Sequence, residues 1–381
     1  MLKSRKAPVL LTTVLAASAL FFWLAKGIFP GGPQKPSPRE SFQVMERVIG
    51  YIKADYLEEP DPKKVMDGAF QGLVNSLDVL SGYLDKPAAA TYAASAKAPL
   101  KDIGAILFKQ ANAFPLVVGV LEGSPAAKAG LRVGDYLSAV DDRPTIVWSL
   151  TEAEVRLKDP AGGKVRLRVI RDNATKEMEI ERAAIYDKPF TVSAQKGTAG
   201  IVRIHHFFVP LAAEFRKSAL PGLTPAAGPL VLDLRDCHEG SDAEAAAFLN
   251  IFLKSDRIGY FEKKGGAKDD LGCPAAPALE TQPLAVWVNQ ATMGPAEIAA
   301  AVLRDQKRAK VVGIATPGLT GRREIFPLGQ GDALVLTTAV FCLPSGDKLW
   351  GKGVTPDVKI DLRKMETKDY LEKTPGLATG R

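Results

Sequence analysis

The chain has 381 residues, 46% hydrophobic and 24% charged, which is typical of globular protein and enough for two or three domains. Its 50 basic and 43 acidic residues give a net charge of +7. The basic residues are scattered, whereas a nucleic-acid-binding protein would cluster them, so no nucleic-acid partner is expected. Because no metal-ligand spacing and no nucleotide-binding loop stands out, we expect no metal and no cofactor.

The three cysteines are too few for a disulfide framework. One bridge could form in an oxidising compartment, and the remaining thiol would then be a small buried hydrophobe. The sequence does not choose the pair among Cys237, Cys273 and Cys342.

The first segment carries a membrane signal. Lys3, Arg5 and Lys6 precede an uncharged, mostly apolar run at 7–25 that Lys26 closes. A helix of about 19 residues reaches roughly 28 Å, close to the thickness of the hydrocarbon core. Small residues lie in the middle of this run, before four bulky ones. This order favours an uncleaved signal anchor at 1–29 over a cleaved signal peptide or a core helix.

Positive charge before an apolar run places the N-terminus in the cytoplasm. We therefore expect a single-pass protein of a bacterial inner membrane, with the bulk of the chain in the periplasm or otherwise outside the cytoplasm. The Pro-rich residues 30–38 would form a stiff tether.

Residues 39–87 are predicted to be helical. Apolar residues recur at spacings of three and four from Phe42 to Tyr56, and Asp61-Pro62 opens a second helix. We expect this helical pair to pack on the core.

A PDZ-like pattern follows. Residues 123–135, GSPAAKAGLRVGD, combine a short helix and Gly-terminated turns before a strand at 136–140. Further strands are expected at 116–121 and 164–170, and a second helix at 151–157. The pattern resembles a PDZ domain, which we place at 88–184.

PDZ domains hold a peptide's terminal carboxylate with backbone N–H groups and add the peptide as an extra strand. The matching loop here is Ile103, Gly104, Ala105 and Ile106. Gly104 has no Cβ and lets the backbone approach a ligand. The resemblance implies binding of protein or peptide C-termini at this loop, and the alternative is a domain that only packs against the core.

The region at 283–313 is predicted to be a βαβ unit. An apolar strand at 284–288 meets a polar turn at 289–295, an Ala-rich amphipathic helix at 296–303 and a second apolar strand at 309–313. In open α/β folds the turn after the first strand gathers helix N-terminal N–H groups and often carries the chemistry.

This unit resembles the core of the carboxy-terminal processing (tail-specific) serine peptidases. Asn289 and Glu297 fix the register of the family motif, in which the nucleophilic serine falls at Gly294. The general-base lysine falls at Leu319, and the glutamine that orients it falls at Arg323. Leucine cannot accept a proton, so the resemblance implies a member without its nucleophile and base.

The oxyanion loop is also altered. Residues 229–235 match a strand of the family that ends in two glycines, which lend N–H groups to the developing oxyanion. Here Glu239 replaces the first glycine and only Gly240 remains. A carboxylate beside developing negative charge opposes catalysis.

The resemblance covers about 40–362 and implies an α/β fold. We expect a crotonase/ClpP-like αβ peptidase core at 185–363 with an inserted PDZ β-barrel domain, the helical N-terminal segment and one N-terminal membrane helix. Residues 364–381 are predicted to be a flexible tail. The N-terminal segment departs from the family where Val79-Leu80 replaces Pro-His.

Other residues could supply chemistry. Thr292 is interpreted as a surface turn residue without a nearby base. Cys237 and His238 are a tempting nucleophile and base, but neighbours on a strand end point in opposite directions. Of His205 and His206, one should face solvent and one should pack, and neither predicts a metal site.

Two functions follow from these observations. The first is a membrane-anchored pseudopeptidase that binds C-termini through its PDZ domain or regulates an active protease partner. The second is an active carboxy-terminal processing endopeptidase with non-standard catalytic residues.

Overall fold

The computed structural model describes residues 37–223, 228–362 and 366–374. They divide into two compact units, one up to Val65 and one from Met66 onward. The predicted signal anchor at 1–29 and nearly all of the tether at 30–38 lie outside the described residues. Within the described ranges, no helix is long and apolar enough to cross a membrane.

The first unit contains helix α2 (Pro38–Asp55) and the start of helix α3 (Pro62–Asn75). Helix α2 begins where Ser37 and Glu40 form a capping box, each side chain bonding the backbone N–H of the other. The predicted helices of this segment are therefore present.

The second unit begins with the end of α3, strand β1 (Gly82–Leu84) and helix α4 (Lys86–Ser95). The chain just before β1 packs on the domain that follows. The backbone O of Val79 accepts from the N of Leu150 (2.7 Å), and the O of Leu80 accepts from the hydroxyl of Thr151 (2.6 Å). Leu80 is buried in that domain's hydrophobic core. The two residues that replace the family's Pro-His thus anchor the N-terminal segment.

The PDZ-like domain is a strongly bent sheet with strands in the order β2-β3-β4-β6-β7, and β5 pairs with β4. In β6 the side chains of Val165, Leu167 and Val169 are buried and alternate with more exposed basic residues, which is the period of two that the sequence indicates. The elements are β2 (Ala105–Phe108), β3 (Leu116–Val120), α5 (Pro125–Lys128), β4 (Tyr136–Val140), β5 (Arg143–Pro144), α6 (Leu150–Leu157), β6 (Gly163–Arg171) and β7 (Ala174–Arg182).

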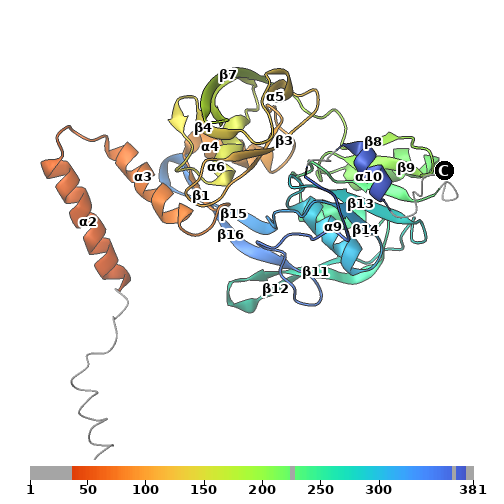
Figure 1. Cartoon of the computed structure of the whole chain (residues 1–381). Coiled ribbons are helices and arrows are strands. Elements are labelled where there is room, and N and C mark those ends of the chain that lie inside the picture. The colour runs from red at the N-terminus through yellow and green to blue at the C-terminus, as the bar shows by residue number, and fades with distance from the viewer. Residues whose placement is uncertain (1–36, 224–227, 363–365, 375–381) are drawn as a thin grey trace, which may run out of the picture. The chain divides into compact units, whose positions relative to one another are not determined.

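The core domain is built on a six-stranded sheet in the order β17-β14-β13-β10-β9-β8. All its neighbouring strands are parallel except β8 and β9. Its elements are β8 (Phe190–Ser193), β9 (Gly200–Ile204), α7 (Leu211–Glu214), β10 (Leu230–Asp233), α8 (Asp242–Leu249), β13 (Leu284–Val288), α9 (Pro295–Asp305), β14 (Lys310–Gly313) and β17 (Val358–Lys359). Figure 1 shows α9 lying against β13 and β14.

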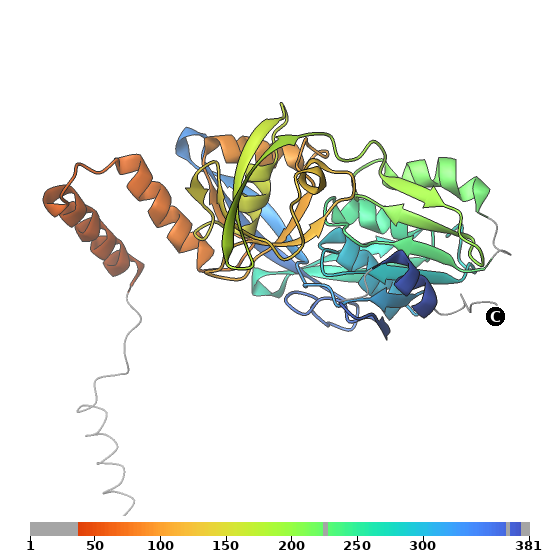
Figure 2. The ribbon, with the colours of Figure 1, turned by 45° about the horizontal axis from the view of Figure 1, so that its top comes forward.

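A second, antiparallel sheet has the order β1-β16-β11-β12, and β15 pairs with β16. Its remaining strands are β11 (Ser255–Lys263), β12 (Lys268–Cys273), β15 (Gly321–Pro327) and β16 (Ala333–Cys342). Because β1 pairs with β16, the segment that leads into the PDZ-like domain is fixed to the core domain. The turned view of Figure 2 shows the strands of both domains.

The predicted βαβ unit is confirmed. Every residue of β13 is buried, as expected of a central parallel strand covered on both faces, and β13 pairs in parallel with β14. Helix α9 buries all residues from Pro295 to Leu303. The strand-to-helix turn between β13 and α9 is thereby held rigidly at the carboxyl edge of the sheet.

The prediction of a flexible tail from 364 onward is wrong for its described part. Helix α10 (Thr367–Lys373) buries Tyr370 against Trp287 of β13, with ring centroids 5.3 Å apart. The hydroxyl of Tyr370 donates to the O of Val288 (2.9 Å), and the indole N–H of Trp287 donates to the hydroxyl of Thr374 (2.8 Å). The large aromatic side chain on β13 requires this cover.

Candidate active-site cleft

Gly294 occupies the turn between β13 and α9, with φ 56° and ψ −121°. A residue with a Cβ would be strained in this conformation, whereas glycine adopts it readily. A Cβ added here would meet only the O of His238 at 3.8 Å and the O of Leu319 at 3.9 Å, which are ordinary contacts. The turn therefore has space for a side chain at Gly294, the position that the sequence analysis aligns with the family's nucleophile.

Glu297, three residues later, organises the turn. Its carboxylate is fully buried and accepts hydrogen bonds from the hydroxyl of Thr316 and from the N–H groups of Gly318, Leu319 and Gly294. Burial raises the pKa of Glu297 to about 7, against the effect of these donors. The side chain ties the start of α9 to the 316–319 segment, where the family's base would lie.

Leu319 is partly buried and packs against apolar residues of the PDZ-like domain. Arg323, at the predicted position of the orienting glutamine, lies in β15 and turns toward helix α6. Its guanidinium donates to the hydroxyl of Thr151 (3.0 Å) and lies 3.6 Å from the carboxylate of Glu154. The two positions that should activate a nucleophile instead make contacts between domains.

The remnant oxyanion loop contains an ion pair that the sequence analysis missed. Lys158, at the C-terminus of α6, binds the carboxylate of Glu239, and both side chains are nearly buried. The charge of Glu239, which the sequence analysis expects to oppose catalysis, is therefore balanced by a cation. Gly240 has φ 133°, and a Cβ there would lie 2.4 Å from the backbone of Phe207, so only glycine fits.

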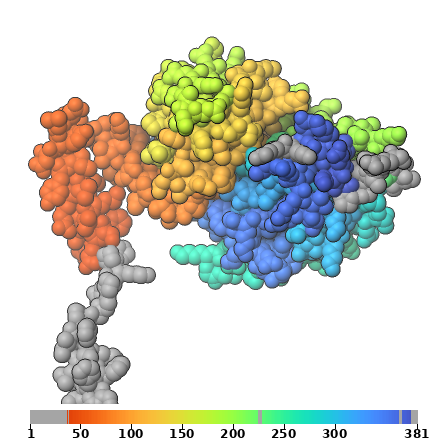
Figure 3. All heavy atoms as spheres, in the orientation of Figure 1, coloured from red at the N-terminus to blue at the C-terminus, as the bar shows by residue number. Residues whose placement is uncertain are grey.

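These residues line one cleft of about 270 Å³ between the PDZ-like domain and the core domain. In Figure 3 the surfaces of these two parts of the second unit adjoin. No group of acidic, histidine or cysteine side chains that could hold a metal occurs among the described residues. The cleft wall includes Thr151, Lys158, Glu239, Gly294, Leu319 and Arg323.

The other candidate residues do not form a catalytic group. Thr292 is fully buried, so the surface interpretation is wrong: its hydroxyl donates to the O of Leu234 (2.8 Å) and accepts from the N of Asn289 (2.9 Å). Cys237 is fully buried, and burial raises its thiol pKa. Burial lowers the pKa of His238 to about 3, which makes it a poor base.

The two histidines after β9 pack rather than coordinate. His205 stacks on Tyr186, with ring centroids 4.9 Å apart, and is partly exposed, while His206 is buried. Burial lowers the pKa of each to about 4, so both are neutral at pH 7. All three cysteines are free and buried, so no bridge forms.

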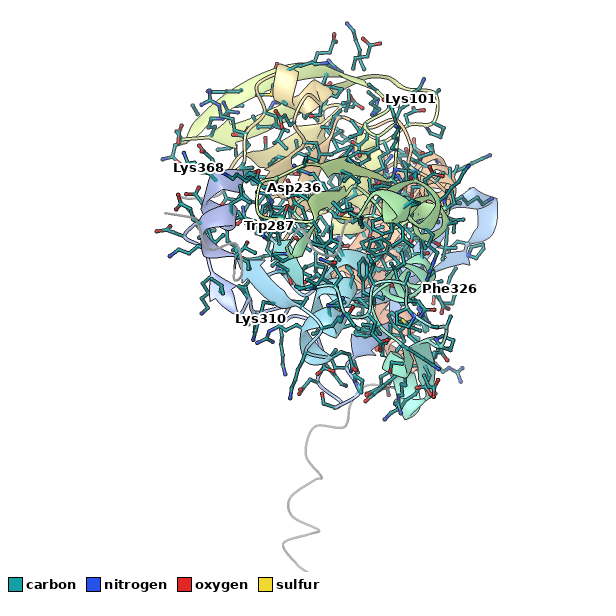
Figure 4. The ribbon with its side chains drawn as sticks, turned by 90° about the vertical axis from the view of Figure 1, so that its right-hand side faces the viewer. Lys101, Asp236, Trp287, Lys310, Phe326 and Lys368 are labelled. Carbon is teal, nitrogen blue, oxygen red and sulfur yellow. The ribbon has the colours of Figure 1, made fainter. Side chains whose placement is uncertain are left out.

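A polar contact fixes the loop after β10. Asn289 donates to the carboxylate of Asp236 (2.8 Å) and accepts from its backbone N (3.1 Å), and Asp236 also binds Arg203 at 2.9 Å. Asp236 and Trp287 are labelled in Figure 4. Asn289 thus positions the loop after β10 relative to the turn after β13.

The loop that is predicted to bind peptides leads into β2. Ile103, Gly104, Ala105 and Ile106 are all buried. Gly104 has φ 83°, and a Cβ there would meet the side chain of Ser124 at 2.4 Å. Two of the loop's N–H groups already have an acceptor in the neighbouring residue, Asp102, which sequence reasoning did not identify.

The chain resembles known proteins over most of its length. Residues 198–360 match the model of peptidase family S41, and residues 116–171 match a PDZ domain model. A carboxy-terminal-processing protease of Bartonella bacilliformis is 29% identical over 81% of this chain and 73% of its own length. The carboxy-terminal processing protease CtpA of Bacillus subtilis is 27% identical over 96% of this chain and 78% of its own.

The fold also has a solved counterpart. The photosystem II D1 C-terminal processing protease superposes with a TM-score of 0.68 and 22% identity, over 84% of this chain and 86% of that one. This likeness shows that the two chains share a fold. The chain has a peptidase family S41 domain preceded by a PDZ domain, and the relatives that it resembles are named carboxy-terminal processing proteases.

Proposed function

We propose that this chain is a pseudopeptidase, which binds protein C-termini through its PDZ domain or regulates an active protease partner. The observation that carries the proposal is the identity of the residues at two positions of the cleft, Gly294 and Leu319. Gly294 offers no hydroxyl, and Leu319 offers no amine. Acyl transfer needs a nucleophile with an adjacent base, and neither is present at these positions.

The charged side chains of the cleft do not replace them. The Lys158 ammonium group is bound to the carboxylate of Glu239 and is directed away from a role at Gly294. Arg323 is permanently protonated and engaged with helix α6. These contacts support a cleft that serves as a structural joint between domains.

The cellular location is part of the proposal. Basic residues before the apolar run at 7–25 favour a membrane anchor with the PDZ and peptidase-like domains outside the cytoplasm, in the periplasm of a bacterium. Chain termini of exported proteins would then be the available ligands.

The test uses the full chain in detergent with an unfolded casein substrate and a fluorophosphonate probe. The Bacillus subtilis protease CtpA serves as the positive control. The proposal predicts neither cleavage nor labelling, while peptides with a free C-terminus bind and their amidated forms bind more weakly. Cleavage by the wild-type chain would establish the second candidate, an active endopeptidase with displaced catalytic groups, which the open space at the Gly294 turn favours. Thr292→Ala and Cys237→Ala would then be the next variants.

A further inference from the structure

The loop predicted to receive a peptide's carboxylate already holds one. The Oδ1 atom of Asp102 accepts a hydrogen bond from the N–H of Ile103 (2.5 Å) and a longer one from the N–H of Gly104 (3.4 Å). PDZ domains capture a terminal carboxylate with backbone N–H groups of such a loop. An N–H group that has an internal acceptor is not free for a ligand.

The position of Asp102 is fixed by its backbone. Its N donates to the O of Ala183 and its O accepts from the N of Ala183, both at 2.9 Å. The residue as a whole is only 9% exposed, so water does not readily replace its carboxyl group. Removing the carboxyl group would leave both backbone bonds in place, and the loop would keep its course.

Asp102 forms no direct ion pair in the described part of the chain. The nearby cation Lys158 is bound to Glu239, and Glu154 adds negative charge. Burial raises the pKa of Asp102, while Lys158 and the two N–H donors act in the opposite direction. In either protonation state the carboxyl group occupies the N–H groups, and when ionised it also repels a second carboxylate.

We propose that Asp102 is the specificity-determining residue of this PDZ domain, because its carboxyl group competes with the terminal carboxylate of a peptide for the N–H groups of Ile103 and Gly104. The wild-type domain then binds free C-termini less tightly than a domain with an unoccupied loop would, and its preference for free over amidated ends is reduced but still present. This inference rests on the proposed peptide-binding function and adds how that site chooses its ligand.

The test compares the full-length wild type with Asp102→Ala, which frees the loop, and with Asp102→Asn, which keeps an acceptor oxygen without charge. Asp142→Asn, an exposed aspartate of the same domain, is the matched control for charge. The probes are fluorescein-labelled peptides ending in Ala, Val or Leu, each made with a free carboxylate and with an amide. Amide hydrogen exchange at Ile103 and Gly104 gives a readout that needs no ligand.

We expect Asp102→Ala to bind carboxylate-ended peptides at least about tenfold more tightly than wild type, with no gain for amidated ones. Asp102→Asn should gain less, Asp142→Asn nothing, and exchange at Ile103 and Gly104 should be faster in Asp102→Ala. If the wild type binds carboxylate-ended peptides as tightly as Asp102→Ala does, the inference is wrong and the proposed function still stands. If no variant binds any peptide, the peptide-binding function itself fails, and the inference fails with it. Unchanged exchange would show that Asp102 does not hold these groups.

Discussion

Gly294→Ser tests whether the turn between β13 and α9 can hold a serine side chain. The new Cβ would make contacts of 3.8 and 3.9 Å, so no steric penalty is expected. The remaining cost is that of placing a residue with a Cβ at φ 56°, which is on the order of 1–3 kcal/mol. Because Leu319 is no base, the new hydroxyl should stay unreactive.

The assay is urea unfolding together with fluorophosphonate labelling. Gly294→Ala is the matched control, because it has the same backbone strain without a hydroxyl. Both variants should lose the same stability to within about 0.5 kcal/mol, and neither should be labelled. A loss above about 4 kcal/mol would mean that the turn is not open as described. Rapid labelling of Gly294→Ser alone would mean that a base is present and would refute the pseudopeptidase argument.

Three further outcomes are expected. Glu297→Gln should cost about 2–4 kcal/mol in urea unfolding, because an amide N–H₂ would face groups that donate to the carboxylate. That cost should be smaller at pH 7.5 than at pH 5. The folded-state pKa of Glu297, about 7, exceeds the ordinary value of 4.5, so the stability that this group contributes at low pH is lost as the pH rises from 4.5 through 7. An equal cost at both pH values would contradict this reasoning. Lys158→Met should cost about 3 kcal/mol by leaving Glu239 unpaired, and the double variant with Glu239→Gln should recover most of it; no recovery would show that the pair is not coupled.

Elements with strong local patterns could be predicted from the sequence. The continuous apolar run of β13 and the buried stripe of α9 form the predicted βαβ unit with β14. The glycine-terminated turns predicted the PDZ domain, and the match to a PDZ domain model confirms it. Such signals depend on neighbouring residues alone.

Features that depend on distant partners were not predictable. Lys158 and Glu239 are 81 positions apart, and nothing in either segment indicates the other. Thr292 looked like a surface residue because polar turns usually are, but its hydroxyl is satisfied by Leu234, 58 positions earlier. The role of Asp102 was not predictable either. An aspartate accepts hydrogen bonds from the N–H groups of its own loop only when the fold buries that loop away from water.

The cover that α10 provides for β13 constrains the order in which the protein can mature. The hydroxyl of Tyr370 bonds Val288, 82 positions earlier, and Thr374 bonds Trp287, 87 positions earlier. During synthesis, β13 is therefore made long before the residues that cover it, and the aromatic side chain of Trp287 stays uncovered until they follow. Loss of α10 would uncover Trp287 again, so the stability of the core domain depends on this helix.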